Sequence, residues 1–428
     1  MPGAIEPHLV IFEPDPRGHT PEWVAHLLHF AAEERRGLPV TFVVAPELAD
    51  GLETALAGVN HHNIQIERLS ARARDLCLSP RFIVSAFARW WLMRRHLKRA
   101  RASHGLFLCL DHLSLPLALG LGGAGANISG ILFRPSIHYG GFGANTLKPR
   151  EQVRDLRKRI LYAMMLRNPS LTRVFSLDPY FPGHNRHQRA RHRKVERLAD
   201  PAFPLPPAAG GDFGEIPADR LLFFLFGSLT ERKGILVLLD ALRHMHPLAA
   251  DRCAVLIAGD LDPGLRAAVE KGLAALAQFQ PSLWVEVRNG ILPAGELAAL
   301  VHRSDVILAP YQRFVGSSGV MIWAANAGKP VLTQDYGLLG KFVRDYALGH
   351  AVDTTDPEVL GSAMSEIARN GTGKILDPEK AGDFLRDRTP RHFAATLFDT
   401  VASDPISAAP AFVDHAKASL TGHASSLS

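Results

Sequence analysis

Residues 221–234 read LLFFLFGSLTERKG, in which six apolar residues run into a glycine, two cations and a second glycine. The apolar run predicts a buried strand, and the residues from Gly234 onward predict a helix. A turn at Gly227 lets backbone amides approach an anion, and Arg232 and Lys233 can neutralise a diphosphate. A surface turn with charged residues would explain this segment equally well when it is taken alone. Its interpretation therefore depends on the surrounding sequence.

On both sides of this segment, short apolar runs typical of strands alternate with longer amphipathic runs typical of helices. Downstream we expect helices at 234–244, 265–279, 294–301 and 318–327, and strands at 254–258, 283–287, 305–309 and 330–333. Upstream we expect strands at 8–12, 38–45, 105–110, 128–133 and 173–177, and a helix at 21–36 with Thr20 as its N-cap. Strands that alternate with helices indicate parallel sheets of the α/β class.

The length of the chain suits two such domains, because 428 residues would fill two cores of about 200 residues each. Residues 198–220 contain five prolines and three glycines, a composition typical of a linker. We therefore predict two doubly wound domains that face each other across a central cleft. The predicted boundaries are a first domain at 1–200, a linker at 201–220, a second domain at 221–388, a helix at 389–403 that packs back toward the first domain, and a disordered tail at 404–428.

A second candidate phosphate site lies in residues 314–320, FVGSSGV, shortly after the strand expected at 305–309. Gly316, Ser317, Ser318 and Gly319 stand where a loop enters a helix. Free amides and hydroxyls at that end of a helix favour phosphate oxygens. An ordinary serine N-cap would produce the same pattern. Two anion-suited helix N-termini in one predicted domain make the phosphate interpretation the stronger one.

These two segments are parts of a longer pattern. From Gly227 to Pro357 the sequence resembles the donor-binding domain of the retaining glycosyltransferase family 4, the glycosyl transferases group 1. The landmarks are RKG at 232–234, IAG at 257–259, the strand and loop at 304–311, AGKP at 327–330, and DYG at 335–337. The loop at Gly18 and His19 resembles the glycine loop of the same family. The resemblance implies the GT-B architecture, in which two Rossmann-like domains face a cleft.

The resemblance also implies an activity and a set of site residues. The donor substrate would be a nucleotide-diphosphate sugar, and transfer would retain the anomeric configuration without a metal or other cofactor. Lys233 and Arg232 would stabilise the leaving diphosphate. His112, after the strand at 105–110, would lie near the transferred sugar, although a histidine hydrogen-bonded within its loop fits equally well. The donor-binding residues that the resemblance implies are Gly18, His19, Gly227, Ile291, Gly316, Ser317, Ser318 and Gly319.

One departure from the family pattern concerns mechanism. The family usually carries two glutamates in an E-x₇-E spacing, and here Val315 and Trp323 occupy the matching positions. Neither side chain can accept hydrogen bonds as a carboxylate does. The predicted function is transfer of a sugar to a saccharide or lipid-linked acceptor. Two alternatives stay open, a nucleotide-sugar epimerase with the same fold and a catalytically silent binding protein.

Two further motifs suggest other chemistry but stand in the wrong context. Residues 120–125, GLGGAG, match a dinucleotide fingerprint, yet a helix is expected before them and a strand after them, which is the reverse of the required order. Asp260 and Asp262 resemble a metal-binding pair, but they stand in a proline-containing turn that we expect to be solvated. The three cysteines show no metal-ligand spacing. We therefore expect no metal site.

Charge is distributed unevenly along the chain. Residues 1–200 hold 28 Lys and Arg against 17 Asp and Glu, whereas residues 201–428 hold 20 against 25. Residues 81–101, RFIVSAFARWWLMRRHLKRAR, contain seven Lys and Arg and no acid, and the cluster at 186–197 adds more positive charge. Such a helix could lie on anionic lipid, or it could be a core-facing helix with a solvated basic face.

The surroundings of the protein are predicted from the same features. The N-terminus lacks the basic region of a signal peptide, and the uncharged stretch at 113–133 is too rich in glycine for a transmembrane helix. We expect a cytoplasmic protein that is peripheral at the inner face of a membrane. Its expected partners are a nucleotide-sugar donor, an acceptor and an anionic membrane surface, with no nucleic acid because no binding module is recognisable.

Overall fold

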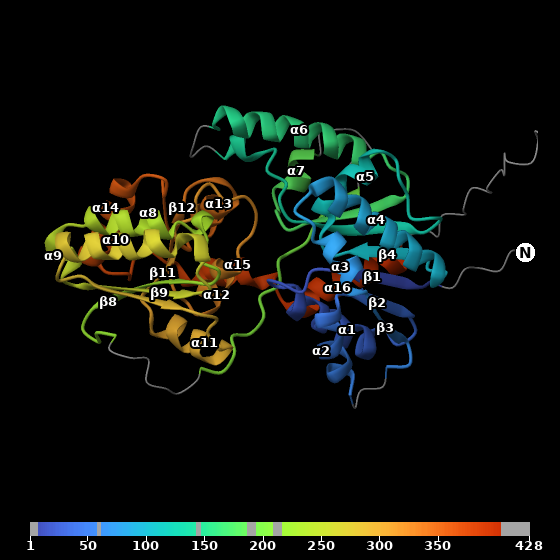
Figure 1. Cartoon of the computed structure of the whole chain (residues 1–428), viewed down its shortest axis with the longest axis horizontal. Coiled ribbons are helices and arrows are strands. Elements are labelled where there is room, and N and C mark those ends of the chain that lie inside the picture. The colour runs from blue at the N-terminus through green and yellow to red at the C-terminus, as the bar shows by residue number, and fades with distance from the viewer. Residues whose placement is uncertain (1–6, 58–60, 143–146, 186–193, 209–215, 404–428) are drawn as a thin grey trace, which may run out of the picture.

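The computed structural model of the protein describes residues 7–57, 61–142, 147–185, 194–208 and 216–403. Within these residues the chain forms two α/β domains, each built on one parallel sheet (Figure 1). The predicted pair of doubly wound, Rossmann-like domains is therefore confirmed. The tail predicted at 404–428 and most of the basic cluster at 186–197 lie outside the described residues.

The sheet of the first domain has the strand order β3-β2-β1-β4-β5-β6-β7. Its strands are β1 (Leu9–Glu13), β2 (Val40–Val44), β3 (Ile64–Arg68), β4 (His104–Phe107), β5 (Asn127–Leu132), β6 (Leu171–Ser176) and β7 (Val195–Arg197). Strands β1 and β2 are buried along their whole length, which explains their continuous apolar runs. The order reverses between β1 and β4, and in such sheets ligands bind at this switch point.

Helices cover both faces of this sheet. They are α1 (Thr20–Glu34), α2 (Pro46–Leu56), α3 (Ala71–Cys77), α4 (Phe82–Arg99), α5 (Ser114–Ala118), α6 (Pro149–Met165) and α7 (Phe181–Asn185). One core layer joins α1 and α2 to the sheet, and the opposite layer joins α4, α5 and α6 to it. The last described helix, α16 (Pro390–Ser403), completes the first layer, where Phe393, Leu397 and Phe398 are fully buried (Figure 1).

The sheet of the second domain has the order β10-β9-β8-β11-β12-β13, with its switch point between β8 and β11. Its strands are β8 (Leu221–Phe226), β9 (Cys253–Gly259), β10 (Trp284–Asn289), β11 (Val306–Ala309), β12 (Val331–Gln334) and β13 (Gly349–Val352). The helices are α8 (Ile235–Arg243), α9 (Pro247–Ala250), α10 (Arg266–Phe279), α11 (Ala294–Arg303), α12 (Gly319–Asn326), α13 (Gly337–Tyr346), α14 (Pro357–Asn370) and α15 (Pro378–Arg386). Helices α8, α10 and α14 cover one face, and α11, α12, α13 and α15 cover the other.

The two domains also touch beyond the linker. Helix α6 of the first domain reaches the second through Glu151, whose Oε1 accepts a hydrogen bond of 2.7 Å from Nε of Arg313. In the same region Arg154 donates to the hydroxyl of Tyr336 at 3.1 Å. Tyr139, which follows β5, is buried in the core of the second domain. These contacts hold the switch points of the two sheets on opposite sides of one cleft.

The structure bears on two local expectations. Thr20 is not the N-cap of α1 but its first residue, because the carbonyl of His19 already accepts the N–H of Trp23 at 3.1 Å. In the basic segment at 81–101, α4 buries Leu92, Met93 and Leu97 in the core, whereas several of its cations and the apolar side chains of Phe82, Ile83 and Trp91 are exposed. One side of α4 therefore faces the core, and its contact with lipid stays a prediction. No helix among the described residues has the length and apolar character needed to cross a membrane.

Candidate active site

Two loops of the second domain meet at the switch point between β8 and β11. Gly227 follows β8 with a φ of +106°, in the region of backbone space that glycine tolerates best. Residues Glu231–Lys233 form a short 3₁₀ helix before α8. Gly234 has a φ of +78°, and a Cβ added to it would lie 1.9 Å from the carbonyl oxygen of Pro310, just after β11. Glycine therefore lets the loop with the two cations lie directly against the loop that leads to α12.

Lys233 is joined to the start of α12 through Tyr311. The ammonium of Lys233 donates a hydrogen bond to the Tyr311 hydroxyl and lies 4.2 Å from the centroid of its ring. The same hydroxyl shares a hydrogen bond of 2.9 Å with Oγ of Ser318. Ser318 stands at the N-cap of α12, but its side chain caps no helix amide. The first-turn amides of α12 thus stay available to a ligand beside Lys233.

Arg232 lies close to a cation from the other domain. Its guanidinium carbon is 4.6 Å from the centroid of the Phe314 ring. Desolvation lowers the pKa of Arg232, and the charge of Arg134 lowers it further. Arg134 directly follows the residues of β5 and Phe133, and neither arginine forms an ion pair with another described residue. Two neighbouring cations without a carboxylate partner favour the binding of an anion between them.

The first domain closes on the same segment through its glycine loop. A Cβ added to Gly319 would lie 2.3 Å from Cε1 of His19. A Cβ added to Gly316, whose φ is +112°, would lie 3.1 Å from the carbonyl oxygen of Phe133. Gly18 precedes His19 with a φ of +69°. The structure therefore brings Gly18 and His19 to the segment that holds Gly316, Ser317, Ser318 and Gly319, and their contact with a donor stays a prediction.

His112 lies on the first-domain side of the cleft, in a 3₁₀ helix (Leu110–Leu113) that follows β4. Desolvation lowers the pKa of His112, and the charge of Arg89 lowers it further, while Asp111 acts in the opposite direction. Asp111 is fixed by the backbone N–H of Phe133, which donates to its Oδ2 at 2.7 Å. These effects together favour the neutral imidazole, which can accept a proton or a hydrogen bond.

Glu13 ends β1 at the same edge of the sheet and is 3% exposed. Its Oε1 accepts a hydrogen bond of 2.8 Å from the backbone N–H of Asp15. Burial raises the pKa of Glu13 to about 7, against the opposing effects of that hydrogen bond and of the Arg89 charge. A carboxyl group that titrates near neutrality thus lies behind the loop that carries Gly18.

Replacing Glu13 by glutamine should change how stability depends on pH. Because the folded-state pKa of Glu13 lies above its ordinary value of 4.5, the folded state binds the proton more tightly than the unfolded state does. The stability that this proton confers is present at low pH and is lost as the pH rises to about 7. We expect the melting temperature of the wild type to fall, relative to that of Glu13→Gln, between pH 5 and pH 8. A difference between the two proteins that is constant over this range would contradict the assignment.

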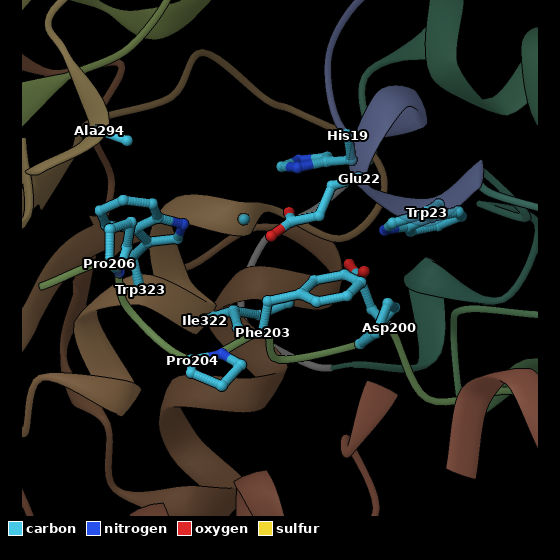
Figure 2. Close-up of a pocket in the computed structure, with 12 residues that line it drawn as sticks. His19, Glu22, Trp23, Asp200, Phe203, Pro204, Pro206, Ala294, Ile322 and Trp323 are labelled. Atoms are coloured by element: carbon cyan, nitrogen blue, oxygen red, sulfur yellow. The ribbon is translucent and has the colours of Figure 1, made fainter. Parts of the chain in front are cut away.

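A pocket lies between α1, the linker, α11 and α12 (Figure 2). Figure 2 shows the carboxylate of Glu22 pointing into it below the ring of His19, with Trp323 on the opposite wall. Desolvation raises the pKa of Glu22. Trp323 stands at one of the two positions where the family pattern has glutamate, and its ring also lies 6.1 Å from that of Phe226. The pocket therefore offers a carboxylate from the first domain opposite a tryptophan from the second.

Ile291 is not among the residues that line this pocket. Its side chain is 87% exposed on the loop between β10 and α11, and Ala294 lines the pocket instead. In the turn after β9, Oδ1 of Asp262 accepts the N–H of Gly264 at 2.9 Å, as expected of a solvated turn. Among the residues that the structure describes, no group of three or more His, Cys, Asp or Glu is placed to hold a metal ion.

Four residues of the site were not assigned a role from the sequence. Arg134 directly follows a predicted strand, as His112 does, so the rule that carboxyl ends of parallel strands share an edge could have identified it. Tyr311 stands just after another predicted strand and could have been found in the same way. Glu13 directly follows the strand predicted at 8–12 and could also have been found in this way, although only the tertiary structure shows that it is buried. Glu22 carried no comparable signal, because only the tertiary structure shows that it faces a pocket.

Comparison with known proteins supports this picture. Residues 220–370 match the family described as glycosyl transferases group 1. No curated protein sequence matches the chain. The solved structures that are similar to it include HepE of Anabaena in complex with UDP, with a TM-score of 0.64 and 13% identity over 93% of this chain and 100% of that one.

Two synthases show the same likeness. Sucrose-phosphate synthase from Thermosynechococcus elongatus has a TM-score of 0.64 and 14% identity, over 93% of this chain and 98% of its own. The UDP-forming α,α-trehalose-phosphate synthase from Burkholderia vietnamiensis has a TM-score of 0.63 and 14% identity, over 93% of this chain and 99% of its own. At these identities the likeness concerns the fold. With this fold over the described chain and the family match over residues 220–370, the protein is a GT-B glycosyltransferase whose second domain is of the glycosyl transferases group 1 type.

Proposed function

We propose that the enzyme transfers a sugar from a nucleoside-diphosphate sugar, whose diphosphate binds between residues 227–234 and 316–319. The observation that carries this proposal is the hydrogen-bonded chain from Lys233 through Tyr311 to Ser318. It places an ammonium group beside the open amides of α12, while Arg232 and Arg134 add positive charge without a carboxylate partner. Such a site suits a diphosphate whose negative charge increases as the sugar departs.

In this proposal the three cations supply the electrostatic stabilisation of the leaving group, and no metal takes part. Retention of the anomeric configuration is proposed from the family resemblance. His112, neutral and at the opposite edge of the cleft, would lie near the transferred sugar and the acceptor hydroxyl. The acceptor would be a saccharide or a lipid-linked saccharide, and the enzyme would work in the cytoplasm, with no nucleic acid as partner. The excess of positive charge in residues 1–200 favours an anionic acceptor or surface.

The experiment is a donor panel. The full chain is incubated with UDP-, GDP- and ADP-sugars, with and without candidate acceptors, and released nucleotide and products are measured with EDTA and with Mg²⁺. Because HepE was solved with UDP and glucose, UDP-glucose is the first donor to test. Transfer that EDTA leaves unchanged supports the proposal. Release of an epimerised sugar without acceptor supports the epimerase instead, and nucleotide-sugar binding without turnover supports the silent binding protein, which the absence of the two glutamates would explain.

Glu22 is proposed to take over part of the donor recognition that the family assigns to a glutamate at the position of Trp323. Its carboxylate can accept hydrogen bonds from ribose or sugar hydroxyls, and the Trp323 ring can pack against the base. We expect Glu22→Ala to raise the donor KM by about 10-fold with a smaller effect on kcat, since one hydrogen bond to a charged group contributes roughly 1.5 kcal/mol. Glu33→Ala is the matched surface control, because Glu33 is exposed on the same helix α1 and does not line the pocket. An unchanged donor KM would remove Glu22 from the site.

A further inference from the structure

The outer face of α6 carries a stripe of exposed apolar side chains. Val153 is 57% exposed, Leu156 59%, Ile160 56% and Met164 41%. Their spacing of three and four residues places all of them on one side of the helix. In Figure 1 α6 lies at the margin of the molecule. Apolar side chains in such a continuous row are unusual on a surface that faces only water.

The acids of α6 lie only on its inner side, whereas its cations lie on both sides. Its two acids point inward, where Glu151 pairs with Arg313 at 2.7 Å and Asp155 is 3% exposed and accepts a hydrogen bond from Ser136 at 2.7 Å. The exposed charged residues of the helix and its ends are all basic, namely Lys148, Arg150, Arg157, Arg159 and Arg167. Apart from Gln152, the exposed polar residues of α6 are therefore cations, and none of them is an acid.

From this arrangement we propose that the outer face of α6 docks on an anionic membrane surface. The four apolar side chains enter the boundary between headgroups and acyl chains, and the flanking cations bind the headgroups. A second copy of this chain is a poorer occupant, because two such faces would bring like charges together. A nucleic acid is also a poorer occupant, because its phosphates bind cations and would leave the four apolar side chains without an apolar contact. The inference refines the membrane prediction made from residues 81–101, because it assigns the contact to α6.

Docking through α6 would place the cleft next to the membrane. Glu151 of α6 holds Arg313, which is adjacent to Phe314 in the loop of the candidate phosphate site. Lys158 of α6 donates a hydrogen bond of 2.7 Å to the carbonyl oxygen of Arg134, one of the cations that face that loop. An acceptor held in the membrane would thus be presented beside the donor. This last consequence rests on the proposed function, whereas the docking itself does not.

The test is flotation of the full chain with vesicles of phosphatidylcholine alone and of phosphatidylcholine with phosphatidylglycerol. We expect binding to the anionic vesicles only, and weaker binding at high salt. The double variant Leu156→Glu/Ile160→Glu should bind at least about tenfold more weakly, because it removes two inserted side chains and adds two negative charges. Leu248→Glu is the matched control, since Leu248 is 71% exposed on α9 of the second domain. Arg150→Glu/Arg157→Glu tests the charge separately, and the melting temperature of each variant checks its folding.

Several outcomes would overturn the docking proposal: equal absence from both vesicles, binding that the α6 variants leave unchanged, or a dimer in solution that Leu156→Glu/Ile160→Glu abolishes. Nucleotide release from a soluble donor is measured on the same variants. Because the α6 substitutions lie outside the cleft, this release should be unchanged while vesicle binding is lost. A failure of the proposed transfer activity would appear in the wild type without vesicles, so the two failures are distinguishable.

Discussion

Replacing Lys233 by alanine should lower kcat about 10²-fold or more, because a positioned cation on a leaving group contributes several kcal/mol to the transition state. The ammonium group is held by Tyr311 next to the start of α12, so it need not reorganise when the donor binds. Its contribution should be larger in the transition state than in the donor complex, since the charge on the diphosphate grows during transfer. The decrease should therefore appear in kcat more than in donor affinity.

Steady-state kinetics and calorimetric titration with UDP would separate these two effects. Lys271→Ala, on the exposed side of α10, provides a control for the loss of one positive charge from the same domain. Tyr311→Phe should produce a smaller decrease, because the ammonium group remains but loses its anchor. An unchanged turnover in Lys233→Ala would exclude Lys233 from the mechanism.

Gly234→Ala should destabilise the second domain by about 3 kcal/mol or more, which corresponds to a melting temperature lower by roughly 10 °C. Two effects add at this position. A φ of +78° is unfavourable for alanine, and the new methyl group would lie 1.9 Å from the backbone oxygen of Pro310, which no side-chain rotation can relieve. The loops must separate, and Lys233 would then move away from Tyr311.

The control for backbone conformation is Gly328→Ala. Gly328 also has a positive φ, +64°, but nothing lies within 4 Å of an added Cβ. This variant should lose only about 1 kcal/mol, the cost of the left-handed conformation alone. Thermal unfolding of both variants measures the difference. If Gly234→Ala were no less stable than Gly328→Ala, the close approach of the two loops would be absent in solution.

The second domain could be predicted well because its signals are local. Strand β8 ends at Phe226 as expected, and the glycine turns at Gly227 and Gly316 have the positive φ that their positions require. The pairing of Lys233 with Tyr311, by contrast, joins residues that are distant in the sequence and depends on the order of the strands in the sheet. Hydrophobic periodicity carries no information on such contacts.

The basic segment at 81–101 shows a different limit of sequence reasoning. Its cations are conspicuous in the sequence, but α4 turns Leu92, Met93 and Leu97 into the core. Helix α6 was less conspicuous because its two acids interrupt the run of cations. Only the structure shows that Glu151 and Asp155 face inward, so that the exposed charged residues of α6 are all basic. Which side of a helix is buried depends on the elements that pack against it, and the sequence of the helix alone does not specify them.

Helix α16 has a consequence for how the protein is made. Phe393 and Phe398 fill the layer beneath α1, where the ring of Phe393 lies 4.8 Å from that of Trp23. The residues of this layer are therefore separated by nearly the whole chain. During synthesis the second domain therefore leaves the ribosome before the first domain can complete its hydrophobic layer. The apolar surface beneath α1 stays uncovered until α16 has been synthesised.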